Sequence, residues 1–134
     1  MPARDHHHEA VKNALQKDGW LITHDPRTVV LPERFLYIDL RATRMDKEIA
    51  ILVEVKGFEQ ASQVEALAEA LGKYNLYRAA LQLNGIREPL YLAIPQAAYN
   101  GIVSETLGHQ IIHDYGVRIL VFDVATEEII QWLP

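Results

Sequence analysis

A continuous apolar run, Leu90-Tyr91-Leu92-Ala93-Ile94, stops at Pro95. Such a run is typical of a strand that other layers cover on both faces of its sheet. Helical periodicity over residues 62–83 precedes it, and a helix interrupted near Gly101 is predicted to follow it over residues 96–115. The chain is therefore predicted to be an α/β (α+β) protein in which helices flank a mixed β-sheet.

Local patterns predict the remaining elements. A helix is expected over residues 3–18, with Asp5 in its first turn and Gly19 at its end. Short apolar stretches bounded by turn residues predict strands over residues 20–23, 28–31, 35–42, 48–57, 117–124 and 129–133. The charged link over residues 43–47 is short enough for a hairpin. On the long helix, helical spacing predicts an apolar face made of Val64, Leu67, Ala68, Leu71, Asn75, Leu76 and Ala79.

The size of the chain suits one domain, residues 1–134, with a core of its own. There are no cysteines, which excludes disulfides and thiolate metal sites. No apolar run approaches the roughly twenty residues that span a bilayer, and the N-terminus lacks the apolar segment of a secretory signal peptide. We therefore expect a cytoplasmic protein that does not insert into a membrane.

The chain is acidic, with a formal net charge of −5 when histidine is neutral. A domain that binds nucleic acid unaided usually shows a basic footprint. Three explanations stay open: the DNA-facing side is locally basic, a partner supplies the positive charge, or nucleic acid is not the ligand. Carboxylates that bind a metal also lower the net charge, so DNA is not excluded.

Two neighbouring apolar strands each carry a carboxylate. Asp39 lies in the first strand, where Ile38 and Leu40 are expected to face the core. Glu54 lies in the second strand and shares a face with Lys56, because positions two apart in a strand point the same way. A carboxylate in so apolar a strand is costly to bury unpaired, and the candidates to compensate it are a cation or Lys56.

Oxygen ligands of this kind can hold a divalent cation. Asp39, Glu54 and the backbone carbonyl of Val55 are predicted to bind Mg²⁺ or Mn²⁺, leaving positions for water and a phosphate oxygen. Lys56 is predicted to orient the attacking water and to offset charge on the phosphorus. The alternative is an ion pair of Lys56 with Asp39 or Glu54 on a solvated face of the sheet, where such pairs contribute little.

The first helix contains three consecutive histidines at positions 6–8. Consecutive helical positions diverge by about 100°, so these three side chains are not expected to converge on one ion. His8 and Lys12 flank the apolar face and are candidate accessory residues, although a solvated helix face is the favoured interpretation. Glu9 lies opposite the apolar stripe and is a weak accessory candidate.

Two further groups of residues on predicted helices have side chains that could bind DNA or a metal ion. Lys73, Tyr77 and Arg78 form a basic and aromatic group that could contact phosphate and sugar, or could be ordinary core and surface residues. His109 and His113 are four residues apart, as a pair of metal ligands would be. No glutamate follows His109 as it would in a metalloprotease motif, so a structural role is favoured for both.

Several strings are unusual enough to identify a family. They are Met1-Pro2-Ala3-Arg4-Asp5, Ala10-Val11-Lys12-Asn13-Ala14-Leu15, Lys17-Asp18-Gly19-Trp20, Thr23-His24-Asp25-Pro26, Tyr37-Ile38-Asp39-Leu40, Glu54-Val55-Lys56, Ala70-Leu71-Gly72, Tyr77-Arg78, Leu90-Tyr91-Leu92-Ala93-Ile94-Pro95 and Ile130-Gln131-Trp132. Over nearly its whole length the chain closely resembles the XisH family, the fdxN-element excision controlling factors.

The resemblance implies a role in a site-specific DNA rearrangement. An excision recombinase removes the element, and the family acts with a small partner protein, XisI. The family also resembles the PD-(D/E)XK restriction-endonuclease-like superfamily, whose motif residues match Asp39, Glu54 and Lys56. The superfamily's Gln-x-x-x-Tyr motif, which contacts DNA in some nucleases, is altered because Lys73 stands at the Gln position ahead of Tyr77. Family members carry an apolar or aromatic residue where His6 and His7 stand.

Two functions from different classes follow. The leading hypothesis is a metal-dependent endonuclease that hydrolyses DNA phosphodiesters at Asp39, Glu54 and Lys56. The rival is a non-catalytic accessory module that binds a XisI-like partner and directs the recombinase. The acidic composition favours the rival, and the intact triad favours the enzyme. The substrate, the oligomeric state (a homodimer among the options) and any completion of the DNA surface by a partner are left open.

Overall fold

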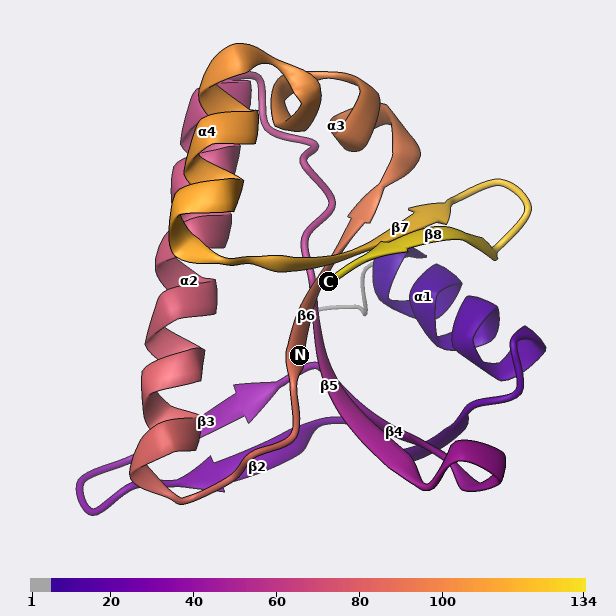
Figure 1. Cartoon of the computed structure of the whole chain (residues 1–134), viewed down its shortest axis with the longest axis vertical. Coiled ribbons are helices and arrows are strands. Elements are labelled where there is room, and N and C mark those ends of the chain that lie inside the picture. The colour runs from indigo at the N-terminus through magenta and orange to yellow at the C-terminus, as the bar shows by residue number, and fades with distance from the viewer. Residues whose placement is uncertain (1–5) are drawn as a thin grey trace.

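A six-stranded sheet runs through the molecule in the order β1-β4-β5-β6-β7-β8, and a separate two-stranded ribbon is formed by β2 and β3. Figure 1 shows this arrangement in a computed structural model that describes residues 6–134. The strands are β1 (Leu21–His24), β2 (Arg27–Val30), β3 (Phe35–Ile38), β4 (Leu40–Arg44), β5 (Ile49–Val55), β6 (Leu90–Pro95), β7 (Arg118–Asp123) and β8 (Glu128–Leu133).

The helices are α1 (His6–Lys17), α2 (Gln63–Leu83), α3 (Gln96–Asn100) and α4 (Thr106–Tyr115), with short 3₁₀ turns at Met45–Lys47 and Ile102–Ser104. The predicted start of α1 and the first-turn role of Asp5 lie outside the described residues. No helix within residues 6–134 combines the length and apolar character needed to cross a membrane.

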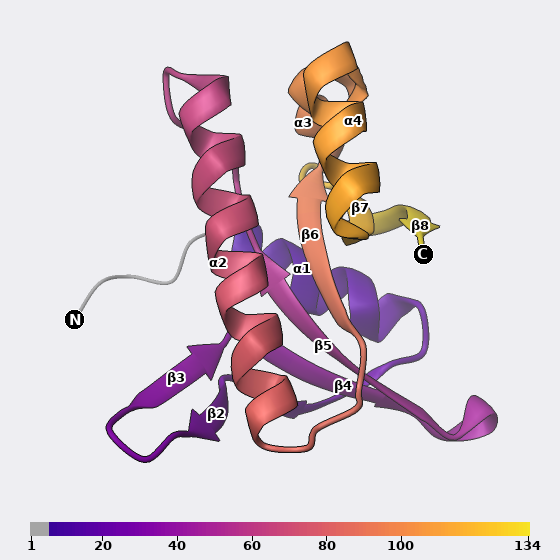
Figure 2. The same cartoon turned by 60° about the vertical axis from the view of Figure 1, so that its left-hand side comes forward.

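The sheet is mixed, as predicted. Strands β5, β6 and β7 are parallel, and β1, β4 and β8 are antiparallel to their neighbours. Helix α1 covers one face, and α2 with α4 covers the other (Figures 1 and 2). Each face therefore buries its own apolar core, and the central strands are covered on both sides as the Leu90–Ile94 run predicts.

Side chains alternate between the two cores along β5. Leu52 packs in the core beneath α2, whereas Ile51 and Val53 pack in the core beneath α1. This alternation follows from the period of two in a strand. It places Glu54, which follows Val53, on the α2 face. The sheet register thus decides which helix can supply a partner for Glu54.

The strand predicted over residues 35–42 is wrong as a single element, because the chain bends at Asp39. Before the bend, β3 pairs with β2 in the ribbon; after it, β4 pairs with β1 and β5 in the main sheet. Ile38 and Leu40 are both buried as predicted, but they lie in opposite cores. The period of two applies only within one strand, so it fails across the bend.

The apolar face predicted for α2 is also wrong in part. Leu67 and Leu71 are buried, but Val64 and Leu76 are more than half exposed. The buried face also includes Ala66, Ala70, Tyr74, Tyr77, Ala80 and Leu81. The small alanines allow α2 to approach the sheet closely. The Tyr74 hydroxyl forms hydrogen bonds with the backbone of the sheet, so this side of α2, which also carries Tyr77, faces the core.

Other local predictions are confirmed. Strands β4 and β5 form a hairpin closed by the 3₁₀ turn at Met45–Lys47. The helix predicted over residues 62–83 is present as α2, and the structure adds that the Ser62 hydroxyl accepts the backbone N–H of Glu65 and so caps its start. The predicted helix over residues 96–115 is interrupted at Gly101, which separates α3 from the turn before α4.

Candidate active site

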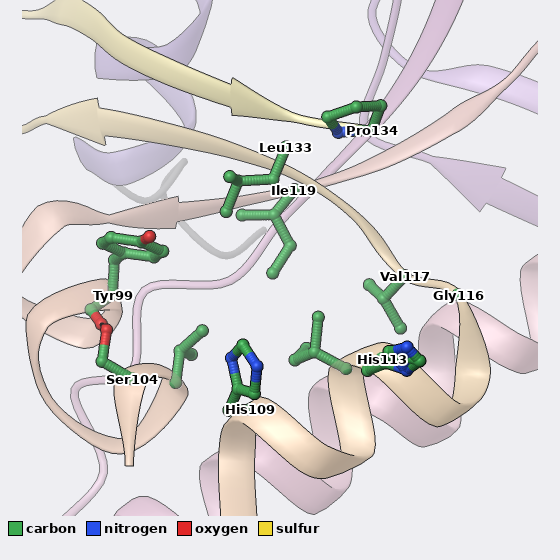
Figure 3. Close-up of a pocket in the computed structure, with 11 residues that line it drawn as sticks. Tyr99, Ser104, His109, His113, Gly116, Val117, Ile119, Leu133 and Pro134 are labelled. Atoms are coloured by element: carbon green, nitrogen blue, oxygen red, sulfur yellow. Dashed lines mark hydrogen bonds between the residues drawn. The ribbon is translucent and has the colours of Figure 1, made fainter. Parts of the chain in front are cut away.

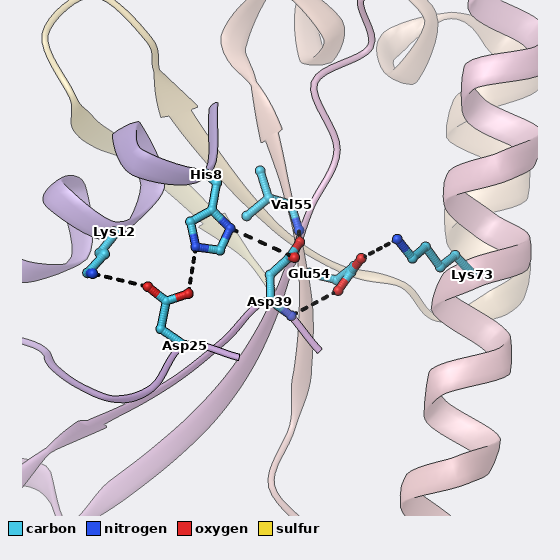
Figure 4. Close-up of polar contacts among 7 residues, drawn as sticks. All are labelled: His8, Lys12, Asp25, Asp39, Glu54, Val55 and Lys73. Atoms are coloured by element: carbon cyan, nitrogen blue, oxygen red, sulfur yellow. Dashed lines mark hydrogen bonds and ion pairs between the residues drawn. The ribbon is translucent and has the colours of Figure 1, made fainter. Parts of the chain in front are cut away.

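Asp39 and Glu54 meet where β4 begins and the antiparallel β5 ends. The backbone N–H of Asp39 donates to Glu54 Oε1 over 3.1 Å, and the backbone N–H of Val55 donates to Asp39 Oδ2 over 2.8 Å (Figure 4). Each carboxylate is thus fixed by the backbone beside the other. The bend at Asp39 makes this possible, because it carries the side chain out of the strand pattern and toward Val55.

The Glu54 carboxylate is nearly buried, with 3% of its side chain exposed. Its main compensation comes from α2, where Lys73 Nζ lies 2.9 Å from Oε2. Lys73 is half exposed and reaches Glu54 from the solvent side. The approach leaves Oε2 in an ion pair but without a regular hydrogen bond. A cation at this oxygen would therefore share or replace the contact with Lys73.

The charges around Glu54 oppose one another. Burial, followed by the negative charge of Asp39, raises the pKa of Glu54 from 4.5 to about 7, and the nearby Lys73 only partly offsets this. Partial burial acts to lower the pKa of Lys73, but its contact with Glu54 and the charge of Glu54 outweigh burial, so the pKa of Lys73 is raised. Lys73 therefore stays charged, while Glu54 titrates near neutral pH.

Lys56 follows the end of β5 and shares a small cavity with Glu54. The cavity has a volume of about 120 Å³, and Lys73 and Glu69 also line it. Lys56 Nζ pairs with Glu69 Oε2 over 3.0 Å rather than with either carboxylate of the site. The alternative of a solvated Lys56–Glu54 or Lys56–Asp39 pair is wrong, because Glu54 is buried and pairs with Lys73 instead.

His8 lies on the other side of Asp39, on α1. Its Nδ1 is 3.8 Å from Asp39 Oδ1, and its Nε2 is 2.8 Å from Asp25 Oδ1. Lys12 Nζ donates to Asp25 Oδ2 over 3.0 Å, so a chain of contacts runs from Lys12 through Asp25 and His8 to Asp39 (Figure 4). The favoured prediction of a solvated face is wrong for His8, which is buried.

Asp25 was not identified from the sequence as a site residue, because Asp25-Pro26 is a typical turn pair. One feature of the sequence could have indicated Asp25. It follows the strand predicted over residues 20–23, which comes directly after the first predicted helix. Glu9 is exposed on α1 and does not contact Asp39 or Glu54. Of the accessory candidates, His8 and Lys12 are therefore joined to the site, and Glu9 is not.

The predicted DNA-contacting residues separate in the structure. Lys73 Nζ lies over the ring of Tyr77, 5.7 Å from its centroid, and Tyr77 is buried against the core. Burial, then the charge of Glu54, raises the pKa of Tyr77, so its hydroxyl stays protonated. Arg78 turns toward Asn75 and the backbone oxygen of Gly116. Lys73 and Tyr77 thus border the carboxylate site, whereas Arg78 points elsewhere.

His109 and His113 line a different pocket, with a volume of about 340 Å³, between α4 and the sheet (Figure 3). Most of its lining is apolar, including Val117, Ile119 and Leu133. Among residues 6–134, no third histidine, aspartate, glutamate or cysteine joins His109 and His113 at metal-ligand spacing. The structural role favoured from the sequence therefore agrees with their surroundings.

The site can serve two chemical purposes. Two carboxylates and the Val55 carbonyl provide hard oxygen donors of the kind that hold a divalent cation, which at Glu54 Oε2 would share or replace the contact with Lys73. Two amines, Lys56 and Lys73, stand near enough to balance negative charge at the cavity. Without a cation, the same residues form a closed network in which Lys73 neutralises Glu54.

Comparisons with known proteins agree with this fold. The family model described as XisH protein matches residues 1–130. The crystal structure of an XisH family protein from Nostoc punctiforme is 37% identical in sequence and has a TM-score of 0.89, over 97% of this chain and 100% of that one. The crystal structure of a fdxN element excision controlling factor protein from Anabaena variabilis is 39% identical, with a TM-score of 0.90, over 98% of this chain and 100% of that one. No curated protein matches the chain.

Proposed function

Because the chain belongs to the XisH family, we propose that it acts in excision of a DNA element and hydrolyses DNA phosphodiesters at the Asp39–Glu54 site. One observation carries the proposal: two carboxylates from the ends of adjacent strands meet beside Lys56 and Lys73. We further propose that the fold is of the restriction-endonuclease-like PD-(D/E)XK type, which places its motif carboxylates and lysine in this way.

Mg²⁺ or Mn²⁺ would be held by Asp39, Glu54 and the Val55 carbonyl, and when bound would lower the pKa of a coordinated water and polarise a phosphate oxygen. The protein's own residues prepare this chemistry. His8, held by Asp25, keeps the Asp39 carboxylate in place. Lys56 orients the water and offsets negative charge on the phosphate. Glu54 must be ionised to bind the cation, which requires a pH near or above its raised pKa.

A specific observation also favours the accessory function. Lys73 already neutralises Glu54, and the whole chain carries a net charge of −5, which opposes unaided DNA binding. In this second proposal the domain binds a XisI-like protein, directs a recombinase, and keeps the carboxylates for stability. The two proposals differ in whether loss of Glu54 charge abolishes a chemical activity.

The test is a nuclease assay on supercoiled plasmid, linear duplex and branched DNA with Mg²⁺ or Mn²⁺, with and without the XisI-like partner. Glu54→Gln keeps the size of the side chain and removes its charge, and Glu105→Gln, at the exposed N-cap position of α4, is the matched control. We expect cleavage by the wild type and by Glu105→Gln, and none by Glu54→Gln.

Cation binding provides an independent readout. A site that binds Mg²⁺ only in the folded state stabilises the protein by about 2.7 kcal/mol at a hundredfold excess over Kd, which raises the melting temperature. We expect this rise in wild type and in Glu105→Gln and not in Glu54→Gln. Absence of both cleavage and the Mg²⁺-dependent rise, with the partner bound and the protein folded, would contradict the enzyme proposal and favour the accessory module.

A further inference from the structure

We propose that His6, His7 and Glu59 form a second metal site, for a first-row transition-metal ion of the Zn²⁺ type. One ligand atom from each of these residues lies within 4.8 Å of the other two. Within residues 6–134 this is the one group of three or more histidines and carboxylates at such spacing. The proposal does not depend on the proposed nuclease function.

Two of the three consecutive histidines converge, which the sequence does not predict. The rings of His6 and His7 lie with their centroids 4.2 Å apart, and His7 Nδ1 is 3.1 Å from Glu59 Oε1. His8 follows the expected divergence and points away to Asp25. The third ligand therefore comes not from α1 but from the segment that follows β5.

The His7 ring is held in position before any ion arrives. His7 is buried, and its ring meets the edge of Phe122 at a centroid distance of 6.1 Å and an interplanar angle of 75°. On the other side it lies against Gly57, where a Cβ atom would come within 2.8 Å of His7 Nδ1. A side chain at position 57 would therefore displace the ring. The fixed ligand is thus buried, and the other two, His6 and Glu59, are exposed.

The donor set selects the class of ion. Two imidazole nitrogens and one carboxylate oxygen suit Zn²⁺, Co²⁺ or Ni²⁺, whereas Mg²⁺ prefers oxygen ligands alone. Zn–N and Zn–O bonds of about 2.0–2.2 Å place tetrahedral ligand atoms roughly 3.4 Å apart. The 3.1 Å separation of His7 from Glu59 is already near this value. Movement of His6 and Glu59 toward the ion would complete the three-ligand site.

The consequence for the molecule is a cross-link. His6 and His7 belong to the first turn of α1, and Glu59 lies three residues after Lys56. A bound ion would join the start of α1 to the connection between β5 and α2. These segments carry His8 and Lys56, so the ion would brace the two sides of the carboxylate site without contacting it.

The test uses tag-free, full-length protein with Zn²⁺ titrated in a calorimeter and Co²⁺ as a spectroscopic probe. Visible absorption of bound Co²⁺ reports histidine coordination directly. His6→Ala and Glu59→Gln change exposed side chains, so both variants should fold like the wild type. His109→Ala removes another exposed histidine and is the matched control.

We expect one Zn²⁺ per chain in the wild type and in His109→Ala. Each ligand variant should bind Zn²⁺ at least about tenfold more weakly and lose the Co²⁺ absorption. Excess Mg²⁺ should leave both signals unchanged, because it competes only for oxygen ligands. Equal binding by wild type, His6→Ala and Glu59→Gln, or displacement of Co²⁺ by Mg²⁺, would overturn the proposal.

Discussion

Lys73 Nζ lies 2.9 Å from Oε2 of Glu54 and joins α2 to the centre of the sheet across the buried carboxylate. The pair is asymmetric, since Lys73 is half exposed and Glu54 is not. Removing the exposed partner leaves the buried one uncompensated, which costs more than the pair contributes when intact. Lys73 is therefore a stabilising residue of the site.

Lys73→Met should destabilise the protein in a pH-dependent manner. Near pH 8 Glu54 is ionised, and losing its cation should lower the free energy of unfolding by about 1–3 kcal/mol. Near pH 5, well below the raised pKa of about 7, Glu54 is protonated and the loss should be smaller. Urea unfolding at both pH values measures this. Lys47→Met, at an exposed position, is the control. An equal loss at both pH values would show that the pair is not the cause.

Glu54 should make stability fall as pH rises from about 4.5 to about 7. Its folded pKa of about 7 exceeds its unfolded value of 4.5, so the folded state binds more protons in this window and loses that advantage as pH rises. Relative to Glu54→Gln, which does not titrate, the wild type should lose on the order of 3 kcal/mol across the window.

The measurement is the difference in unfolding free energy between wild type and Glu54→Gln at a series of pH values. Titrating groups that do not interact with Glu54 affect both proteins equally and cancel. A difference that does not change with pH would mean that the pKa of Glu54 is ordinary in the folded state. Saturating Mg²⁺ should suppress the loss if the cation binds the ionised carboxylate.

The sequence predicts the frame of the molecule because periodic burial is a local property. The run Leu90–Ile94 identifies the covered strand β6, and the apolar pattern around Glu54 identifies β5. The meeting of Asp39 and Glu54 is also predicted, since their strands are adjacent and joined by a short hairpin. These features depend only on neighbours in sequence and on the alternation of side chains.

The partners of the carboxylates could not be predicted in the same way. Lys73 pairs with Glu54 because α2 turns Tyr74 and Tyr77 inward, whereas the apolar spacing favours a face containing Val64 and Leu76. Asp25 reaches His8 across 17 positions in sequence, and a turn aspartate carries no local sign of that contact. Tertiary packing determines both contacts, so no short segment of the sequence is enough to predict them.

Tyr74→Phe should cost about 1–3 kcal/mol in unfolding free energy, because it leaves two backbone groups unpaired. The Tyr74 hydroxyl donates to the Leu90 carbonyl over 2.8 Å and accepts the Arg118 N–H over 3.2 Å, which links α2 to β6 and β7. Chemical denaturation measures the loss, with the exposed Tyr115→Phe as the control. If both variants were equally stable, the buried hydroxyl would contribute nothing.

Lys56→Ala should lower cleavage more than cation binding, if the proposed hydrolysis is correct. Loss of a group that stabilises charge on the phosphate reduces kcat by about 10²–10³-fold. The Mg²⁺ concentration for half-maximal activity should change little, because Lys56 is not a ligand. Steady-state assays over a range of Mg²⁺ separate the two effects. Lys47→Ala is the control, and a raised Mg²⁺ requirement with unchanged kcat would assign Lys56 to cation binding instead.

Two hydrogen bonds join the carboxylates of Asp39 and Glu54 to the backbone of the neighbouring strand. These bonds extend the pairing of the sheet itself. The last backbone pairing between β4 and β5 is that of Leu40 with Val53. Beyond this pair, the backbone N–H of Asp39 donates to the Glu54 carboxylate, and the backbone N–H of Val55 donates to the Asp39 carboxylate. The acidic pair therefore closes the open end of a hairpin, and Glu54 also lines the cavity. These two hydrogen bonds stabilise the hairpin whether or not the protein acts on DNA, so relatives that have lost such an activity should still carry an oxygen acceptor at both positions.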